Sequence, residues 1–197
     1  MIDTELFVKK TLYPFQDNAV NNIISALTES GEDTNILFQL PTGGGKTVIF
    51  SNIAERYIES TGKKVLILTH RIELSVQTSR QLSSLKIPNM VINSSVKDLN
   101  DQDDYTCFTA MVETLNNRLQ EDPNFVKNVG LVIVDEAHYN SFRKIFQYYG
   151  NVNILGVTAT PLSSNKALPL NDNYDKLIVG ESISALIEYG YLSDAET

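Results

Sequence analysis

Residues 41–47 read PTGGGKT and combine three glycines with a cation and two hydroxyls. Glycines allow successive backbone N–H groups to curl around an anion, because no Cβ stands in the way. A helix that begins directly after such a loop adds free N–H groups and partial positive charge. The Lys46 ammonium then suits phosphate oxygens, and the Thr47 hydroxyl suits Mg²⁺. The segment predicts a phosphate-binding loop of variant form, since Leu40 stands where the strict pattern has glycine; a chance glycine-rich turn is the alternative.

A second group of reactive side chains lies in residues 131–138, LVIVDEAH, where an apolar run ends in two carboxylates. Asp135 stands at the tip of the expected strand, where it could hold Mg²⁺ through water, because that ion keeps much of its hydration shell. Glu136 follows, where it could orient and deprotonate a water that attacks a γ-phosphate. An acidic pair alone is more often a solvated strand end. Together with the upstream loop, it predicts a nucleoside triphosphate site.

The elements that must position these residues follow from the apolar pattern. Short runs of strand type alternate with longer segments of helical period. Several runs are nearly continuous in Val, Ile and Leu, which is typical of strands buried on both faces of a parallel sheet. The alternation predicts an α/β fold with a mostly parallel, doubly wound sheet flanked by helices on both faces. Strands are expected at 36–40, 65–69, 90–92, 105–109, 131–135 and 154–158, helices at 16–27, 47–59, 73–85, 111–119 and 182–189, and surface loops at 94–106 and 162–176.

Composition places limits on the class of protein. A length of 197 residues suits one α/β domain spanning 1–197, and no apolar stretch approaches the ~20 residues that a membrane-spanning helix needs. Cys107 is the only cysteine, which excludes an internal disulfide and a cysteine-based metal site and suits a reducing cytoplasm. The net charge of −8 means that any contact with nucleic acid must be local.

Several motifs resemble, in order, the first RecA-like domain of a superfamily 2 helicase or translocase of the DEAD/DEAH-box type, and the resemblance covers nearly the whole chain. The ending at 181–193, ESISALIEYGYLS, is similar to that of the branch containing XPB-like and type I or III restriction-subunit-like helicases. The other matching segments are LYPFQ at 12–16, the phosphate loop at 41–47, motif Ia at 65–77, motif Ib at 111–119, DEAH at 135–138 and VTAT at 157–160.

The resemblance implies ATP and Mg²⁺ as cofactors. Gln16 would read the adenine edge and Tyr13 would stack beside the base; the alternatives are a surface amide at a helix start and a packed core tyrosine. Thr47 and Asp135 would hold the metal, partly through water, and Glu136 would position and activate the water. The implied nucleotide-binding and catalytic residues are Tyr13, Gln16, Thr42, Gly43, Gly44, Gly45, Lys46, Thr47, Asp135 and Glu136.

Three further residues would couple the nucleotide state to the nucleic-acid face in the family: His138, Thr158 and Thr160. A hydrogen-bonded polar core residue is the alternative for His138, and local hydroxyl bonds to the backbone are the alternative for the threonines. An arginine usually follows this last motif two residues past the proline, but here Pro161 precedes Leu and Ser.

The nucleic-acid contacts implied by the resemblance are made to the sugar-phosphate backbone without base reading. Arg71 is the strongest of these contacts, with a surface charge at a helix start as the alternative. The motif Ib segment departs from the family because Met111 and Glu113 replace the usual Thr and Gln, and a carboxylate there would repel phosphate. DNA is favoured over RNA from the branch alone. The implied contact residues are Thr69, His70, Arg71, Thr109 and Thr114.

The resemblance also implies a second RecA-like domain, which supplies arginine fingers worth about 10³–10⁵ in rate. No arginine follows Thr160 in this chain. We therefore expect an ATP-binding half of a DNA helicase that binds Mg-nucleotide, hydrolyses it slowly and does not unwind duplexes alone. The alternative is a stand-alone, nucleotide-gated module that docks on a partner. A small-molecule phosphotransferase is disfavoured, because it has no need of DEAH or TAT.

Overall fold

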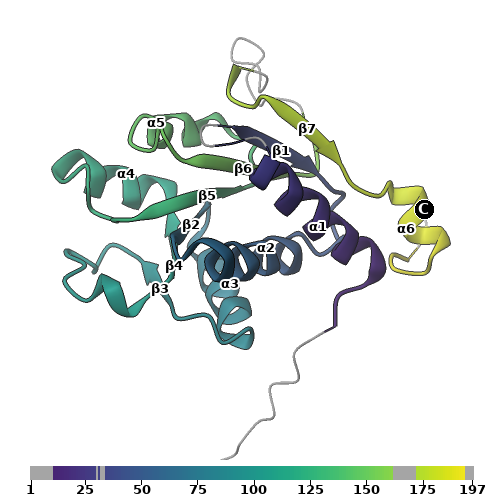
Figure 1. The fold of residues 1–197 in the computed structure, drawn as a ribbon, viewed down its shortest axis with the longest axis horizontal. Coiled ribbons are helices and arrows are strands. Elements are labelled where there is room, and N and C mark those ends of the chain that lie inside the picture. Colours follow the sequence, from purple (N-terminus) through teal and green to yellow (C-terminus); the bar gives the residue numbers. More distant parts are fainter. Residues whose placement is uncertain (1–10, 30, 32–33, 162–171, 194–197) are drawn as a thin grey trace, which may run out of the picture.

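The computed structural model describes residues 11–29, 31, 34–161 and 172–193. Seven strands form one sheet in the order β3-β4-β2-β5-β6-β1-β7, and all the pairs between them are parallel (Figure 1). The middle strands are buried along their length because they carry Val, Ile and Leu on both faces, as the sequence pattern predicts. The strands are β1 (Asn35–Gln39), β2 (Lys64–Thr69), β3 (Asn89–Ile92), β4 (Cys107–Met111), β5 (Val129–Asp135), β6 (Asn153–Thr158) and β7 (Lys176–Val179).

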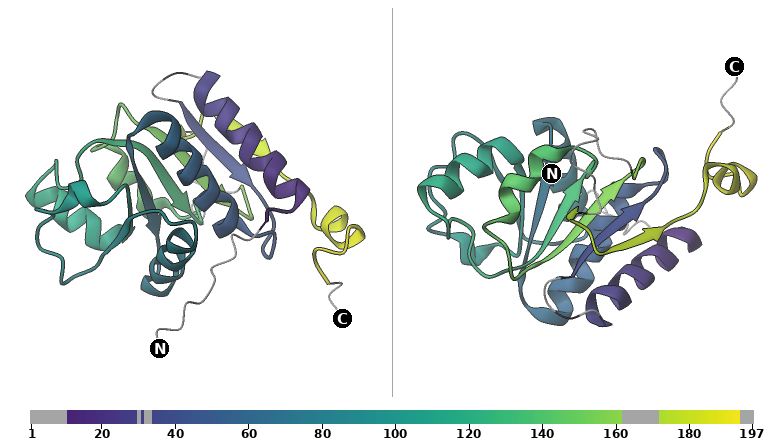
Figure 2. Two further views of the ribbon diagram at one scale, coloured as in Figure 1. Left: turned by 60° about the horizontal axis from the view of Figure 1, so that its bottom comes forward. Right: turned by 90° about the horizontal axis from the view of Figure 1, so that it is seen from above.

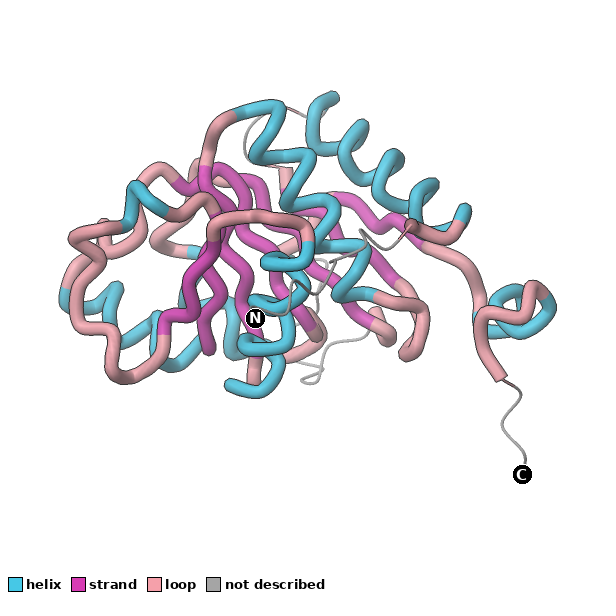
Figure 3. The backbone as a smooth tube through the Cα atoms, turned by 90° about the horizontal axis from the view of Figure 1, so that it is seen from below, coloured by secondary structure: helices cyan, strands magenta, loops and turns pink. Residues whose placement is uncertain are grey.

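Helices cover both faces of the sheet (Figures 2 and 3). One face packs against α1, α2 and α3, and the other packs against α4 and α5. Each layer buries its own apolar cluster, with Phe38 and Phe50 in the first and Phe108 and Phe142 in the second. The helices are α1 (Pro14–Glu29), α2 (Lys46–Thr61), α3 (Ile72–Ser84), α4 (Val112–Glu121), α5 (Arg143–Phe146) and α6 (Ile183–Glu188), with 3₁₀ turns η1 (Gln102–Asp104) and η2 (Asn140–Phe142).

The predicted fold class is confirmed. Every predicted strand and helix is present, with bounds that differ by no more than two residues. Two elements were not predicted, β7 and the one-turn helix α5. The surface loop expected at 162–176 is wrong in its last part, because Tyr174 is buried and Lys176 begins β7, while residues 162–171 lie outside the described part. The loop expected at 94–106 is partly packed, since Leu99 and Gln102 are buried.

The strand register brings distant motifs to one edge of the sheet. β6 pairs with both β1 and β5, with Thr158 opposite Gln39 and Val157 opposite Asp135. The carboxyl ends of these three parallel strands therefore lie side by side, and this edge is where ligands bind in open α/β sheets. Each of the three strands is followed at this edge by one of the motifs found in the sequence.

The packing around Gly156 in β6 gives a test of the fold. A Cβ built on Gly156 would lie 2.5 Å from the Tyr174 hydroxyl and 2.6 Å from its ring, and Tyr174 is itself buried. The substitution Gly156→Ala is expected to lower the free energy of unfolding by about 1–3 kcal/mol, because the ring must shift inside a packed layer. Urea unfolding measures the change.

Gly150→Ala is the matched control. Gly150 is exposed and has no atom within 4 Å of an added Cβ, so it should change stability by less than about 0.5 kcal/mol. Equal stability of the two variants would contradict the packing of Tyr174 over β6.

Candidate active site

The phosphate loop connects β1 to α2 in a conformation that depends on its glycines. Gly43 and Gly45 have φ of 86° and 81°, in the left-handed region that favours glycine. The Gly44 N–H donates to the Pro41 carbonyl at 3.1 Å, which closes the turn. Gly45 is the N-cap residue of α2, so Lys46 and Thr47 occupy its first turn. The loop thus leads into a helix N-terminus, the setting that favours anion binding.

Gln16 connects the start of α1 to this loop. Its side chain is buried, its Oε1 accepts from the Tyr13 N–H at 3.1 Å, and its Nε2 donates to the Gly44 carbonyl at 3.4 Å. A Cβ on Gly45 would collide with the same Nε2. Gln16 therefore helps to hold the loop in place in this structure. Its reading of adenine stays a prediction, as does base stacking by Tyr13, which is 48% exposed.

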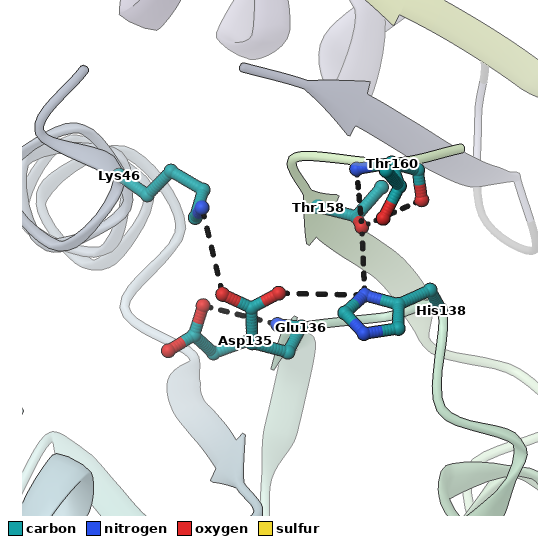
Figure 4. A network of polar contacts seen from close by, with 6 residues as sticks. All are labelled: Lys46, Asp135, Glu136, His138, Thr158 and Thr160. Carbon is teal, nitrogen blue, oxygen red and sulfur yellow. Dashed lines mark hydrogen bonds and ion pairs between the residues drawn. The ribbon is translucent and has the colours of Figure 1, made fainter. Parts of the chain in front are cut away.

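The two carboxylates lie across the sheet edge from the loop. Asp135 ends β5 and is 7% exposed, and its Oδ1 accepts from the Glu136 N–H at 3.0 Å. Glu136 has φ of 55°, a conformation that costs a non-glycine residue free energy and is concentrated at functional sites. Lys46 Nζ lies 3.5 Å from Glu136 Oε1 (Figure 4). The loop lysine and the acidic pair thus lie side by side at this edge of the sheet, and their joint use as a nucleotide site stays a prediction.

Burial dominates the electrostatics of Asp135. Its desolvation, with a smaller effect from the charge of Glu136, raises the pKa of Asp135 to about 6, against the opposing pull of Lys46. A divalent cation would relieve this cost by holding the ionised form. Among the described residues no cluster of three or more His, Cys, Asp or Glu side chains could hold a metal alone.

A chain of polar contacts leads from Glu136 to the end of β6 (Figure 4). His138 Nδ1 lies 3.3 Å from Glu136 Oε2 and 3.0 Å from Thr158 Oγ1. The Thr158 hydroxyl donates its only hydrogen to the Thr160 carbonyl at 2.8 Å and accepts from the Thr160 N–H at 3.2 Å. Thr158 must therefore accept from His138, which assigns the proton to Nδ1. The local hydroxyl bonds expected as the alternative for the threonines exist alongside the contact with His138.

The five residues predicted to contact nucleic acid separate into buried and accessible groups. Thr69 and Thr109 are fully buried, and their hydroxyls bond within the domain, Thr69 to Ser75 Oγ at 2.7 Å and Thr109 to the Ser75 carbonyl at 3.3 Å. These threonines position α3 on the sheet instead of presenting their side chains to solvent. Arg71 is exposed at the start of α3, and His70 and Thr114 are partly exposed.

Tyr139 is part of this surface although no sequence motif predicted it. Its ring lies against His70, with centroids 3.9 Å apart, and against His138, with centroids 4.2 Å apart. Tyr139 lines a hollow of about 670 Å³ together with His70, Arg71, Leu74 and Glu136. Burial, and then the charge of His138, lowers the pKa of His70. The sequence signal for Tyr139 was an aromatic residue directly after DEAH. This signal was insufficient, because His70, which its ring contacts, lies far away in the sequence at the end of β2.

The charge of Glu113 is paired in the structure. Lys144 in α5 lies 2.6 Å from both carboxylate oxygens of Glu113 in α4. The repulsion of phosphate expected from Glu113 is therefore weakened by a cation that the one-dimensional pattern did not place there.

Three features together define a P-loop domain of the RecA-like type. They are a loop with left-handed glycines after β1, a lysine at the start of α2, and an acidic pair at the end of β5, which lies two strands from β1 in the sheet. The chain belongs to the family described as "Type III restriction enzyme, res subunit", whose model matches residues 9–163. It is the first RecA-like domain of a superfamily 2 helicase.

Curated relatives share the chain's sequence over most of its length. The putative ATP-dependent helicase IRC3 of Saccharomyces cerevisiae is 29% identical, over 94% of this chain and 28% of the yeast protein. A 51.5 kDa protein of a Lactococcus phage is 32% identical, over 77% of this chain and 29% of the phage protein. The chain thus spans less than a third of the length of these relatives.

Solved structures share the fold. The Type ISP restriction-modification enzyme LlaGI, in complex with a DNA substrate mimic, matches with a TM-score of 0.72 and 18% identity, over 94% of this chain and 21% of that one. The Hef helicase domain of Pyrococcus furiosus matches with a TM-score of 0.64 and 24% identity, over 85% of this chain and 38% of that one.

In the described part of this chain, none of the helices is both long and apolar enough to cross a membrane.

The raised pKa of Asp135 predicts a pH-dependent stability. Its ordinary value is 3.8, so between about pH 4 and 6 the folded state holds a proton that the unfolded state has released. Stability falls as the pH rises through this window, and the loss is complete above about pH 6. Asp135→Asn lacks this loss and should be about 2–3 kcal/mol more stable than the wild type at pH 7.5, with the difference vanishing near pH 4.

Urea unfolding of both proteins from pH 4 to 8, without nucleotide or divalent cations, makes the measurement. Asp101→Asn, at an exposed aspartate, is the control. Parallel pH profiles for wild type and Asp135→Asn would contradict the burial of the carboxylate.

Proposed function

We propose that this chain is the ATP-binding N-terminal domain of a superfamily 2 DNA helicase or translocase, which couples Mg-ATP binding and hydrolysis to movement on nucleic acid. The single observation that carries the proposal is the 3.5 Å contact between Lys46 Nζ and Glu136 Oε1. It joins the phosphate loop to the acidic pair, residues 90 positions apart in sequence, at the edge where such sheets bind ligands.

The residues present fit a magnesium-bound nucleotide. Gly43 and Gly45 give the loop its left-handed backbone, which leaves room for an anion at the N-terminus of α2. Thr47 and Asp135 would hold Mg²⁺, partly through water, and the bound ion would supply positive charge to the phosphates. The buried carboxylate of Asp135 supports this role, because its ionised form is costly without a cation.

The chain's own side chains have defined tasks in this proposal. Lys46 exchanges its Glu136 partner for phosphate oxygens, and Glu136 Oε1 is then released to accept a proton from the attacking water. His138 holds the other carboxylate oxygen, at 3.3 Å, and so keeps Glu136 oriented while Lys46 moves. Thr158 and Thr160 carry the change towards the nucleic-acid face.

Nucleic-acid binding rests on a local surface. Arg71 is the exposed member of the predicted set, and His70 and Thr114 are partly exposed. Contacts of this kind hold the sugar-phosphate backbone. DNA is favoured because named relatives include the ATP-dependent DNA helicase Hel308 of Thermoplasma acidophilum, 26% identical over 57% of this chain. With a net charge of −8, the affinity of this domain alone should be low and salt-dependent.

Hydrolysis requires groups beyond these residues. No arginine occurs after Thr160, so arginine fingers must come from a second RecA-like domain, in the same protein or in a partner. The chain covers 28% of the yeast relative, which leaves ample length for such a domain in proteins of this kind. A reducing compartment such as the cytoplasm suits the lone, buried Cys107.

Nucleotide binding is tested by Lys46→Ala. Mg-ATP at about 100 times its dissociation constant should stabilise the wild type by about 2.7 kcal/mol, which corresponds to a rise in Tm of about 5–10 °C. Lys46→Ala should show no rise, because the ammonium that meets the phosphates is gone, while its circular dichroism stays that of the wild type. Differential scanning fluorimetry makes the measurement.

Lys97→Ala, at an exposed lysine far along the chain from the site, is the matched control and should respond as the wild type does. An unchanged wild-type Tm with saturating Mg-ATP would sink the nucleotide proposal, as would an equal response from Lys46→Ala.

Isolated residues 1–197 should turn ATP over slowly. Without arginine fingers, steady-state hydrolysis is expected to fall about 10³-fold or more below that of a two-domain helicase, with or without single-stranded DNA. A coupled phosphate-release assay measures the rate, with Glu136→Gln as the background. Turnover comparable to that of a complete helicase would refute the need for a second domain.

A further inference from the structure

The end of α6 lies against the nucleotide site, although none of the roles above uses it. α6 ends at Glu188 with Tyr189 as its C-cap, and the next residue, Gly190, is in the left-handed conformation at φ of 74°. The N–H groups of Tyr191 and Leu192 both donate to the Leu186 carbonyl, at 2.8 and 3.1 Å, and the Leu186 side chain is fully buried. We call residues 190–192 the terminal turn. These bonds fix the turn onto a helix that is itself anchored in the core.

Leu192 packs against the phosphate loop. A Cβ built on Gly43 would lie 2.7 Å from Leu192 Cδ2, so the side chain is in contact with the loop backbone at the first left-handed glycine. Leu192 and Thr42 also line the same hollow of about 780 Å³. An apolar side chain thus contacts the glycine-rich loop from the side of α6.

Tyr191 packs against the segment that leads into α1. Its ring centroid lies 4.6 Å from that of Tyr13 and 5.0 Å from that of Phe15. Tyr13 donates its N–H to the Gln16 side chain, which bonds in turn to the Gly44 carbonyl. The terminal turn therefore reaches the loop by two routes, directly through Leu192 and through Tyr13 and Gln16. Figure 1 shows α6 beside the beginning of α1.

We propose that the terminal turn is a positioning element for the nucleotide, and this rests on the proposed ATP-binding function. Three successive glycines leave the loop many alternative backbone conformations, and selecting one of them on binding reduces affinity. Leu192 and Tyr191 restrict the loop and its Gln16 support before the nucleotide arrives. Both side chains lie at the margin of the core, only partly buried. Their truncation should therefore weaken nucleotide binding more than it weakens the fold.

Leu192→Ala and Tyr191→Ala test the proposal in the full chain. Each should lower the affinity for Mg-ATP, measured with a fluorescent nucleotide, by about fivefold to tenfold, the effect of losing one aromatic or apolar contact. Amide hydrogen exchange without nucleotide should become faster at residues 42–46 in both variants. This second readout would stay unchanged if the turn merely completed the core.

Two controls separate the contact from general destabilisation. Leu177→Ala makes the same change at a side chain 51% exposed on β7, and should leave affinity and loop exchange as in the wild type. Tyr191→Phe keeps the ring contacts and should also bind normally. Leu192→Val, a milder truncation, should give a smaller loss in the same direction.

The outcomes distinguish failure of the positioning role from failure of the proposed nucleotide binding. If the wild type binds Mg-ATP and Leu192→Ala matches Leu177→Ala in affinity and loop exchange, the positioning role is overturned and the nucleotide site stands. If the wild type binds no nucleotide, the proposed function fails and the positioning role fails with it. Weaker Mg-ATP binding together with faster loop exchange, in folded variants, is the result expected.

Discussion

The parallel pairing of β6 with both β1 and β5 is the constraint on which the site depends. Gln39 pairs with Thr158, and Val157 pairs with Asp135, so three strands end at the same level. Because the side chains of these strands are buried on both faces, a shift in register would displace the core as well as the motifs. The hydrophobic pattern that selects the register thereby selects the positions of Lys46 and Glu136, which lie 90 positions apart.

The acidic residues of the site lower the free energy of unfolding that the packed strands provide. Asp135 is buried with its pKa raised to about 6, beside a second carboxylate, and Glu136 adopts a left-handed backbone. Within the described part of the chain, one ammonium, that of Lys46, lies 3.5 Å from Glu136 and is the only ammonium paired with the two acids. The packed core therefore holds a cluster whose negative charge is incompletely balanced. The free-energy cost of burying these carboxylates is part of folding, so a ligand that brings cations would bind without adding that cost.

The sequence was sufficient for the sheet and insufficient for the orientation of individual side chains. Runs rich in Val, Ile and Leu locate β2, β5 and β6, because strands buried on both faces of a parallel sheet favour these residues. Strand ends are different. Thr69 and Thr109 look like surface contacts in a motif, yet they are fully buried, because α3 covers these strand ends and its Ser75 bonds to both hydroxyls.

Elements that form only through tertiary contacts could not be predicted from the sequence pattern. β7 has four residues, largely exposed, and exists through its backbone pairing with β1. Glu136 shows the same limit at the site, because its two oxygens are divided between Lys46 and His138, at 3.5 and 3.3 Å. In the proposed function, a ligand that withdrew Lys46 would leave the Glu136 carboxylate to His138, which is also in contact with Thr158. If that ligand changes the affinity for a partner that contacts Thr158, thermodynamic linkage requires the partner to change the affinity for the ligand by the same factor.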